Sequence, residues 1–352
     1  MKAPEAPWRA ARPQPPGGPV PDRLAALVRG FRGRRVLVLG DLVADEFVYG
    51  RVQRVSREAP VLILEHQGAE VRLGGGANAV NNIKALGATP LPAGVLGRDE
   101  HGRRLRELLR AQRISTAAVI NAPGFATPVK SRILGGGTHA TKQQIVRLDR
   151  IARLPRRSPA RAALKAALGR LPARLDGVLV SDYGLGLLTP GLVRAAVALA
   201  RRRRVPVTVD SRHSLLAFRG MTAVTPNEPE VEAALGMRIG HDRKRLEAAG
   251  RTLLRRLSAQ AVLITRGSDG MALFEPGRPP LHIPIHGSDQ VADVTGAGDT
   301  VIATFTLALA AGASCYDAAR LANYAGGIVV MKYGTRPVTN EELSDAVGGN
   351  SL

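Results

Sequence analysis

The sequence predicts an α/β fold, in which a mostly parallel sheet carries helices on both faces and a small flap of β-strands projects from it. Short continuous apolar runs such as Val36-Leu-Val-Leu-Gly40 are typical of buried parallel strands. Stretches of helical period separate these runs along the chain. Residues 46–73 instead alternate apolar and polar side chains between polar turns, which indicates an antiparallel flap.

The elements follow in order along the chain. We expect strands at residues 36–40, 178–181, 205–210, 223–225 and 261–265, and helices at 77–86, 190–203, 228–235, 242–257 and 301–311. Two further strands, near 127–134 and 144–149, are expected to return to the flap.

The domain organisation follows from length and composition. With 352 residues the chain is long enough for two domains or for one large α/β domain with an excursion. We expect one domain at residues 22–345, with lid strands at about 46–73 and 117–149. A Pro- and Arg-rich leader at 1–21 is expected to be disordered, and residues 346–352 to form a tail.

Composition limits the partners. The chain has 50 Lys+Arg against 29 Asp+Glu, a net charge of +21, which raises the question of nucleic-acid binding. The arginines are scattered, and one Trp, five Tyr and six Phe offer no aromatic platform for bases, so we expect no nucleic-acid partner. We also expect no membrane span, because the longest apolar run, residues 301–311, is far below the roughly 20 residues required.

Cysteine usage points to a reducing compartment. A single cysteine, Cys315, forms no intramolecular disulfide, and scattered histidines do not complete a zinc site with it. The first thirty residues lack the apolar stretch of a secretory signal. The expected location is therefore cytoplasmic.

The most informative segment is Asp293-Val-Thr-Gly-Ala-Gly-Asp299-Thr300, which precedes an apolar helical run. Glycines at a helix N-terminus leave backbone N–H groups free to bind a phosphate. Asp299 lies inside that anion site, where a carboxylate repels phosphate but suits a general base that accepts the proton of an attacking hydroxyl. The alternative is a Gly-rich loop in which Asp299 only caps the helix.

Other phosphate and hydrolase chemistries are excluded. No Gly-Lys pair occurs in the chain, so a Walker A loop is absent. The protein-kinase motifs, a G-x-S-x-G elbow and an H-E-x-x-H helix are also missing.

Four motifs in order resemble the ribokinase/PfkB family of small-molecule kinases. They are Gly74-Gly-Gly-Ala-Asn78, Asn227-Glu-Pro-Glu230, Thr265-Arg-Gly-Ser-Asp-Gly270 and the segment from Asp293 to Asp299. The resemblance extends over residues 35–338. It implies a ribokinase-like three-layer αβα sandwich with a mostly parallel central sheet and a small β-strand lid, and a dimer paired through that lid.

Within this family, further stretches look like the kinase domain that acts on heptose 7-phosphate in ADP-heptose synthesis. They include Gly40-Asp-Leu-Val-Ala-Asp45, Ser56-Arg-Glu-Ala-Pro60, Gln143-Gln-Ile-Val-Arg-Leu-Asp149 and Ser181-Asp-Tyr183. No H-x-G-H nucleotidyltransferase element occurs in this sequence, so the resemblance implies a separate nucleotidyltransferase as a pathway partner. One position departs from the pattern: Leu185 stands where those kinases typically have lysine.

The resemblance also implies roles for individual residues. The catalytic group consists of the base Asp299 and an anion hole at Gly296, Ala297 and Gly298. The sugar site consists of Asp45, Gly75, Gly76, Asn78 and Asp182, with Lys130, Arg132 and Arg147 for the substrate's own phosphate. The ATP site consists of Asn227, Thr265, Gly267, Gly270, Asn323 and Gly327. Asn227 and Glu230 are expected to hold Mg²⁺ through water, and a monovalent cation is expected near Asp293 and Thr295.

Each role has a structural alternative, and the function has rivals. Asn227, Glu230 and Asp45 are also suited to capping helices or turns, and charged flap residues to lying solvated on the surface. The leading hypothesis is an ATP-dependent kinase for the anomeric hydroxyl of heptose 7-phosphate. The rivals are another sugar or nucleoside kinase of the family and a non-catalytic nucleotide- or sugar-binding regulator, which the departure at Leu185 would fit.

Overall fold

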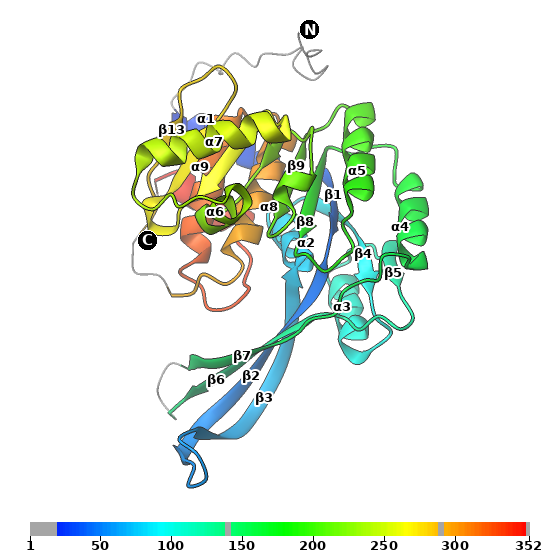
Figure 1. Ribbon diagram of the computed structural model, residues 1–352, viewed down its shortest axis with the longest axis vertical. Helices are drawn as coiled ribbons and strands as arrows, with labels where there is room; N and C mark the ends of the chain where they lie inside the picture. Colours follow the sequence, from blue (N-terminus) through cyan, green and yellow to red (C-terminus); the bar gives the residue numbers. More distant parts are fainter. Residues whose placement is uncertain (1–19, 138–141, 288–291, 350–352) are drawn as a thin grey trace.

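The computed structural model describes residues 20–137, 142–287 and 292–349. Within these residues the strands form two sheets. A nine-stranded sheet with the order β13-β12-β11-β10-β9-β8-β1-β4-β5 is the centre of the molecule, and a four-stranded sheet with the order β3-β2-β6-β7 projects from it as the lid (Figure 1).

The bounds of the strands are β1 (Arg35–Gly40), β2 (Leu42–Val55), β3 (Leu62–Gly75), β4 (Thr89–Leu96), β5 (Ala118–Asn121), β6 (Val129–Gly136), β7 (Gln143–Arg150), β8 (Gly177–Asp182), β9 (Val207–Ser211), β10 (Ala223–Val224), β11 (Ala261–Thr265), β12 (Met271–Phe274) and β13 (Leu281–Ile283). The bounds of the α-helices are α1 (Val20–Arg29), α2 (Gly76–Ala85), α3 (Glu100–Ala111), α4 (Pro159–Gly169), α5 (Pro190–Arg203), α6 (Glu228–Leu235), α7 (Arg243–Leu257), α8 (Ala297–Ala310), α9 (Cys315–Val329) and α10 (Asn340–Val347). Two short 3₁₀ turns are η2 (Leu215–Ala217) and η3 (Gly267–Asp269).

The central sheet is covered on both faces, as the apolar pattern of its strands predicts. Val36 and Val38 of β1 pack into one cluster with α1, α2, α8, α9 and α10. Leu37 and Leu39 of the same strand pack into a second cluster with α4, α5 and α7. All pairs from β5 to β11 are parallel, and only β12 and β13 add antiparallel edges. The predicted three-layer αβα sandwich with a mostly parallel sheet is confirmed.

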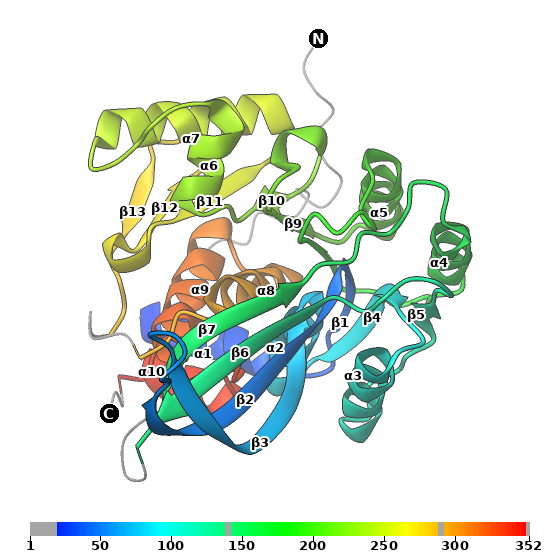
Figure 2. The ribbon, with the colours of Figure 1, turned by 60° about the horizontal axis from the view of Figure 1, so that its bottom comes forward.

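The lid is connected directly to the central sheet through β1 and β2. β2 starts two residues after β1 ends, pairs antiparallel with β3 and parallel with β6, and β7 closes the other edge. Figure 2 shows this curved sheet lying across the front of α2 and α8. The predicted lid range of 117–149 begins too early. Ala118–Asn121 instead forms β5, whose apolar side chains are buried where it pairs with β4 at the edge of the central sheet.

The ends of the predicted domain also shift slightly. α10 continues to Val347, so the predicted boundary at residue 345 falls inside a helix. Residues 1–19 and 350–352 of the predicted leader and tail lie outside the described residues. In the described parts of the chain, no helix is long and apolar enough to cross a membrane.

Candidate active site

The predicted base lies in the first turn of α8, at the carboxyl edge of the central sheet. Asp299 is buried, and its carboxylate accepts two hydrogen bonds. Asn78 Nδ2 donates to Oδ2 at 2.9 Å, and the Tyr183 hydroxyl donates to Oδ1 at 2.8 Å. Burial raises the pKa of Asp299 to about 6, and the two hydrogen bonds oppose that rise. The group is therefore mostly ionised at neutral pH and able to accept a proton.

The predicted anion hole contains two glycines with different surroundings. Gly296 adopts a left-handed φ of 81°, and a Cβ there would lie 2.6 Å from Asn78 Nδ2, so only glycine fits. A Cβ on Gly298 would meet nothing within 4 Å, and this residue is exposed. The first turn of α8 is therefore exposed at Gly298 beside Asp299, while the N–H of Ala297 donates to the Val294 oxygen at 3.2 Å.

The amide of Asn78 is oriented by its own helix. Asn82 Nδ2 donates to the backbone oxygen of Asn78 at 3.0 Å and to its Oδ1 at 3.3 Å. Thr300 Oγ1 donates to Asn82 Oδ1 at 3.0 Å, which ties this pair to α8. Because Oδ1 of Asn78 accepts from Asn82, its Nδ2 is directed at Asp299. Asn78 is thus a partner of the base, in addition to its predicted place beside the sugar.

Tyr183 links the base to two cations. Lys130 Nζ lies 4.5 Å from the centroid of its ring, and the Arg212 guanidinium carbon also lies 4.5 Å from that centroid. Lys130 comes from β6 of the lid, whereas Arg212 follows β9 of the central sheet. Burial lowers the pKa of Lys130, and nearby Arg212 lowers it further. Both side chains are therefore close to the base from different parts of the fold.

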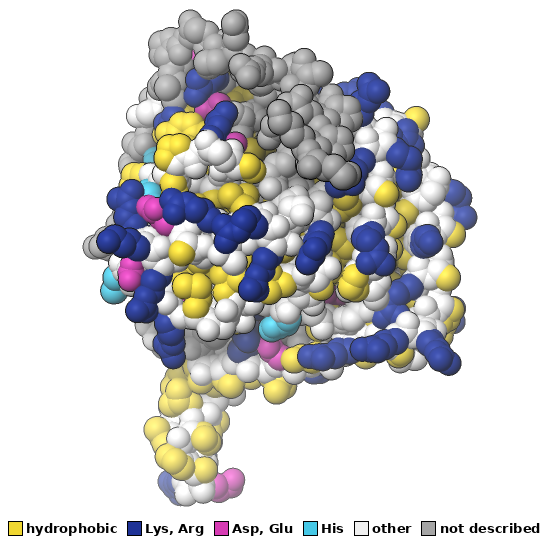
Figure 3. Space-filling view, turned by 45° about the horizontal axis from the view of Figure 1, so that its top comes forward, with side chains coloured by type: hydrophobic (Ala, Val, Ile, Leu, Met, Phe, Trp, Pro, Cys, Tyr) yellow, Lys and Arg dark blue, Asp and Glu magenta, His cyan; other side chains and the backbone are white. Residues whose placement is uncertain are grey.

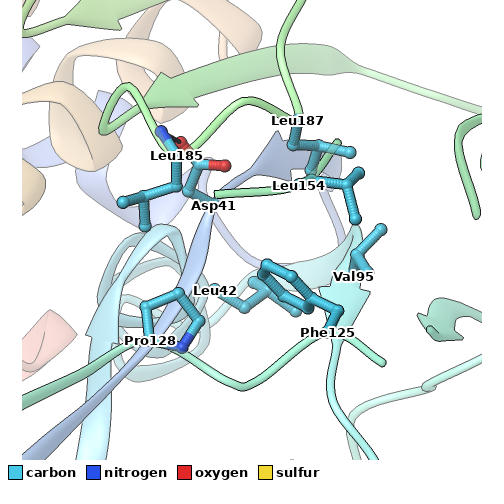
Figure 4. A pocket seen from close by; sticks show the side chains of 8 residues that line it. All are labelled: Asp41, Leu42, Val95, Phe125, Pro128, Leu154, Leu185 and Leu187. Atoms are coloured by element: carbon cyan, nitrogen blue, oxygen red, sulfur yellow. Dashed lines mark hydrogen bonds between the residues drawn. The ribbon is translucent and has the colours of Figure 1, made fainter. Parts of the chain in front are cut away.

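Asp41 holds the loop that carries Tyr183. It lies between β1 and β2, and its Oδ2 accepts the backbone N–H groups of Tyr183 at 2.9 Å and Leu185 at 3.2 Å. Burial raises the pKa of Asp41 to about 7. A small apolar cavity lies next to this carboxyl (Figure 4). It is lined by Asp41, Leu42, Val95, Phe125, Pro128, Leu154, Leu185 and Leu187. Leu185, at the position where relatives typically have lysine, thus lies in largely apolar surroundings.

The predicted sugar residues are only partly free. Asp45 is buried and forms an ion pair with Arg132, with 2.8 Å between Oδ1 and the guanidinium nitrogen. Both carboxylate oxygens of Asp182 are engaged, one by Gly184 N at 3.0 Å and one by Ser211 Oγ at 2.7 Å. Gly75 and Gly76 form the passage from β3 into α2, where Gly76 N donates to Asp41 O at 2.8 Å.

The three cations predicted for the substrate's own phosphate have different surroundings. Lys130 is half-buried beside Tyr183. Arg132 is buried and committed to Asp45. Arg147 lies opposite Arg132 in the β6–β7 register but is exposed and forms an ion pair with Asp149, its Nε 2.9 Å from Oδ1. The structure thus places only Lys130 next to the base.

The two residues predicted to organise Mg²⁺ form a reciprocal cap on α6. Asn227 Oδ1 accepts from Glu230 N at 2.8 Å, and Glu230 Oε2 accepts from Asn227 N at 2.9 Å. Burial raises the pKa of Glu230, and desolvation together with nearby Glu230 raises that of Asp210 strongly. Two carboxylates that disfavour each other's charge fit a hard cation that also binds phosphate oxygens. The described residues contain no group of three or more acidic, His or Cys side chains able to hold a metal alone.

The remaining predicted ATP residues surround the ends of β11 and α9. Thr265 ends β11 and bridges to Asn227, while Gly267 begins η3 and Gly270 follows it. Asn323 Nδ2 donates to Pro284 O at 2.8 Å. Gly327 of α9 packs so closely on the backbone of His286 that a Cβ would lie 2.2 Å from its oxygen.

The predicted monovalent-cation segment is held by one side chain. Asp293 Oδ1 accepts from Thr295 N at 2.8 Å, and its Oδ2 accepts from Gly334 N at 2.9 Å. These bonds tie the loop before α8 to the turn after α9, so Asp293 has a structural role in shaping the anion hole.

Comparison with known proteins identifies a family for part of the chain. The model of the pfkB family carbohydrate kinases matches residues 185–342. Bifunctional protein HldE of Caulobacter vibrioides is 42% identical over 324 residues, which cover 92% of this chain and 65% of that protein. Residues 185–342 are a pfkB-family carbohydrate kinase region. Bifunctional protein HldE of Geobacter metallireducens is 41% identical over 90% of this chain and 64% of that protein. The chain therefore spans just under two thirds of the length of these relatives.

Solved structures share the fold of this chain. Arabidopsis thaliana ribokinase complexed with ribose and ATP superposes with a TM-score of 0.67 at 21% identity, over 90% of this chain and 99% of that one. Escherichia coli phosphofructokinase-2 in complex with potassium gives a TM-score of 0.70 at 17% identity, with the same coverage. The predicted ribokinase-like fold is confirmed.

Three residues at the site carried no predicted role: Tyr183, Arg212 and Asp41. Tyr183 and Arg212 directly follow β8 and β9, which are parallel neighbours. The carboxyl ends of adjacent parallel strands meet at one edge of the sheet, where ligands bind. The position of both residues directly after a predicted strand could therefore have marked them as site residues. Their residue types gave no such signal, since tyrosine and arginine are common on surfaces.

Proposed function

We propose that this protein is an ATP-dependent sugar kinase that phosphorylates the anomeric hydroxyl of heptose 7-phosphate to the 1,7-bisphosphate. The observation that carries the proposal is the buried carboxylate of Asp299, held by two hydrogen bonds beside the exposed N-terminus of α8. A helix cap alone has no need of a buried, doubly hydrogen-bonded carboxylate with a raised pKa. A base next to a phosphate site does.

The reaction uses this arrangement directly. The sugar hydroxyl oxygen forms a bond to the γ-phosphorus of ATP, and its proton passes to Asp299. The bond between that phosphorus and the β,γ-bridging oxygen breaks, and its electron pair leaves on ADP. Backbone N–H groups at Gly296, Ala297 and Gly298 stabilise the negative charge that develops on the transferring group, and that of Ala297 gives up its bond to the Val294 oxygen to do so. Asn78 and Tyr183 keep the carboxylate aimed at the hydroxyl.

ATP and Mg²⁺ are the proposed co-substrate and metal. Asn227, Thr265, Gly267, Gly270, Asn323 and Gly327 are the proposed nucleotide contacts. When bound, Mg²⁺ supplies charge neutralisation for the phosphates, and Glu230 with Asn227 would hold it through water. A monovalent cation near Asp293 and Thr295 is proposed to stabilise the loop before the anion hole.

The heptose phosphate is proposed from the similarity to the HldE proteins and from the charge beside the base. Lys130 is a half-buried cation close to Asp299 and suits an anionic sugar. Asp45, Gly75, Gly76 and Asn78 are proposed to contact the sugar. The lid above them would exclude water and so suppress hydrolysis of ATP.

A homodimer formed through the lid is proposed from its exposed apolar side chains. They are Val55, Val61, Leu62, Ile145, Val146 and Leu148, each at least 41% exposed. Apolar side chains gather on the projecting lid in Figure 3, whereas Lys and Arg dominate much of the face above it. Sedimentation of Leu148→Glu should show monomers where the unmodified protein shows dimers. A cytoplasmic location completes the proposal.

The experiment is ADP release with Mg·ATP and five acceptors: heptose 7-phosphate, fructose 6-phosphate, fructose, ribose and adenosine. The product is assigned by ³¹P NMR, and Asp299→Asn serves as the control for contaminating kinases. Selective turnover of the heptose phosphate at its anomeric position is expected. Turnover of a neutral sugar alone would replace the substrate by that of another pfkB-family kinase. ATP binding with no turnover of any acceptor would favour a regulator.

A further inference from the structure

Arg212 has an exposed, donor-rich side chain that meets no acceptor among the residues that the structure describes. Its backbone N–H follows β9 and donates to Asp182 O at 3.1 Å, which fixes the start of the side chain. Within the described ranges the guanidinium forms no hydrogen bond or ion pair, and its contact is the Tyr183 ring, 4.5 Å from centroid to Cζ. A guanidinium carries five N–H donors in a planar fork that matches phosphate oxygens. Its donors are thus available to a ligand.

Arg212 lies near two carboxylates with different proposed roles in phosphoryl transfer. Asp299 and Glu230 are both close enough for electrostatic attraction to Arg212. Asp299 is the proposed base on the sugar side, and Glu230 belongs to the proposed metal and nucleotide side. In the proposed reaction the phosphoryl group moves from the side of Glu230 to the side of Asp299. Arg212 is the cation at that place that comes from the rigid central sheet and not from the lid.

The Tyr183 ring contacts both Arg212 and the other cation at the site, Lys130. Lys130 is attracted to Asp45 and Asp299, both on the sugar side, and is repelled by Arg212. The two cations contact one aromatic ring whose hydroxyl holds the base. Binding of an anion would reduce the repulsion between these two cations.

We propose that Arg212 is a catalytic residue that binds the oxygens of the transferring phosphoryl group, while Lys130 serves the sugar side. This inference rests on the proposed phosphotransfer function. The sugar oxygen bonds to the γ-phosphorus as the bond to the β,γ-bridging oxygen breaks, and the hydroxyl proton goes to Asp299. Arg212 exchanges no proton in this step; its N–H groups neutralise charge on the equatorial oxygens.

The test compares Arg212→Met with Arg202→Met, an exposed arginine in the last turn of α5. Calorimetry without sugar measures the affinities for a non-hydrolysable Mg·ATP analogue and for Mg·ADP. Arg212→Met should lose about tenfold in affinity for the ATP analogue and none for ADP, since the lost hydrogen bonds reach only the γ-phosphate. Arg202→Met should change neither. Equal losses for both nucleotides, or no loss, would overturn the proposal.

Kinetics provide the second measurement. With the acceptor that the unmodified protein uses, Arg212→Ala should lower kcat about 100-fold with little change in the KM for the sugar. Guanidinium chloride at millimolar concentration should restore part of the lost kcat, which a purely structural role would not allow. Failure of rescue together with unchanged nucleotide preference would contradict the assignment. If no acceptor is turned over, the proposed function fails, but the nucleotide comparison still decides the role of Arg212.

Discussion

The lid and the carboxyl edge of the central sheet differ in whether their cationic side chains are paired with carboxylates. On the lid, Arg132 is paired with Asp45 and Arg147 with Asp149. At the edge of the central sheet, Arg212 and the lid residue Lys130 that reaches it contact an aromatic ring and have no carboxylate partner among the described residues. A paired cation stabilises the protein's own shape, whereas an unpaired cation next to a base is available to a ligand.

Removal of the base should give the largest effect. Asp299→Asn preserves the size of the side chain and an acceptor for Tyr183, but it has no basic oxygen. We expect kcat to fall about 10²- to 10⁴-fold, while calorimetry shows ATP affinity within about twofold of the unmodified protein. Undiminished kcat would remove Asp299 from the mechanism.

The next prediction compares the two lid ion pairs. Arg132→Met leaves Asp45 buried without a partner, which should lower the free energy of unfolding by about 3–5 kcal/mol. Arg147→Met, the matched control on the opposite strand, breaks an exposed pair and should cost less than about 1 kcal/mol. Urea unfolding of both variants measures the difference. Equal losses would show that the buried pair is no more important to the lid than the exposed one.

The third prediction tests whether Lys130 binds the ligand. If this unpaired cation serves a phosphorylated sugar, Lys130→Met should lower kcat/KM for that sugar by about 10- to 100-fold, the range for a hydrogen bond to a charged group. Stability should change little, because no protein carboxylate loses its partner. Arg147→Met, assayed in parallel, should retain nearly full kcat/KM. A larger loss with Arg147→Met would move the substrate phosphate to the outer lid.

The smallest effect is expected at Leu185, where relatives typically have lysine. Its side chain lies in apolar surroundings beside the cavity under Asp41. Leu185→Lys should therefore direct its ammonium to solvent and change kcat/KM by less than about threefold, as for other substitutions away from a site. A tenfold gain with a phosphorylated sugar would instead show that position 185 contacts the substrate.

The sequence predicts the position of some strands well and of others poorly. β1, β8, β9 and β11 are short continuous apolar runs, as strands buried on both faces require, so the sequence alone predicts their positions. β5 is only four residues long, and nothing in the sequence of Ala118–Asn121 tells the edge of the central sheet from the lid. Such an assignment depends on pairing across the chain, which propensity does not encode.

The site divides in the same way. Asp299 and the glycines before it form a contiguous motif, and the sequence predicts their neighbourhood because a helix N-terminus is a local structure. Tyr183 and Arg212 are 29 residues apart along the numbering and meet only because β8 and β9 are parallel neighbours. The ion pair of Arg132 with Asp45 also depends on the tertiary structure, because the two residues are 87 positions apart in the sequence.

The most direct test of the account is the pH dependence of kcat/KM for the sugar in the unmodified protein and in Tyr183→Phe. Burial raises the pKa of Asp299 to about 6, so activity should rise with pH through that value as the carboxylate ionises. Tyr183→Phe removes a donor that stabilises the carboxylate, so the rise should move to higher pH, with about tenfold lower activity near pH 6 and a smaller deficit at pH 8. Titration of substrate phosphates is identical in both proteins and would not shift. Superimposable profiles would contradict the claim that a Tyr183-bound Asp299 is the base.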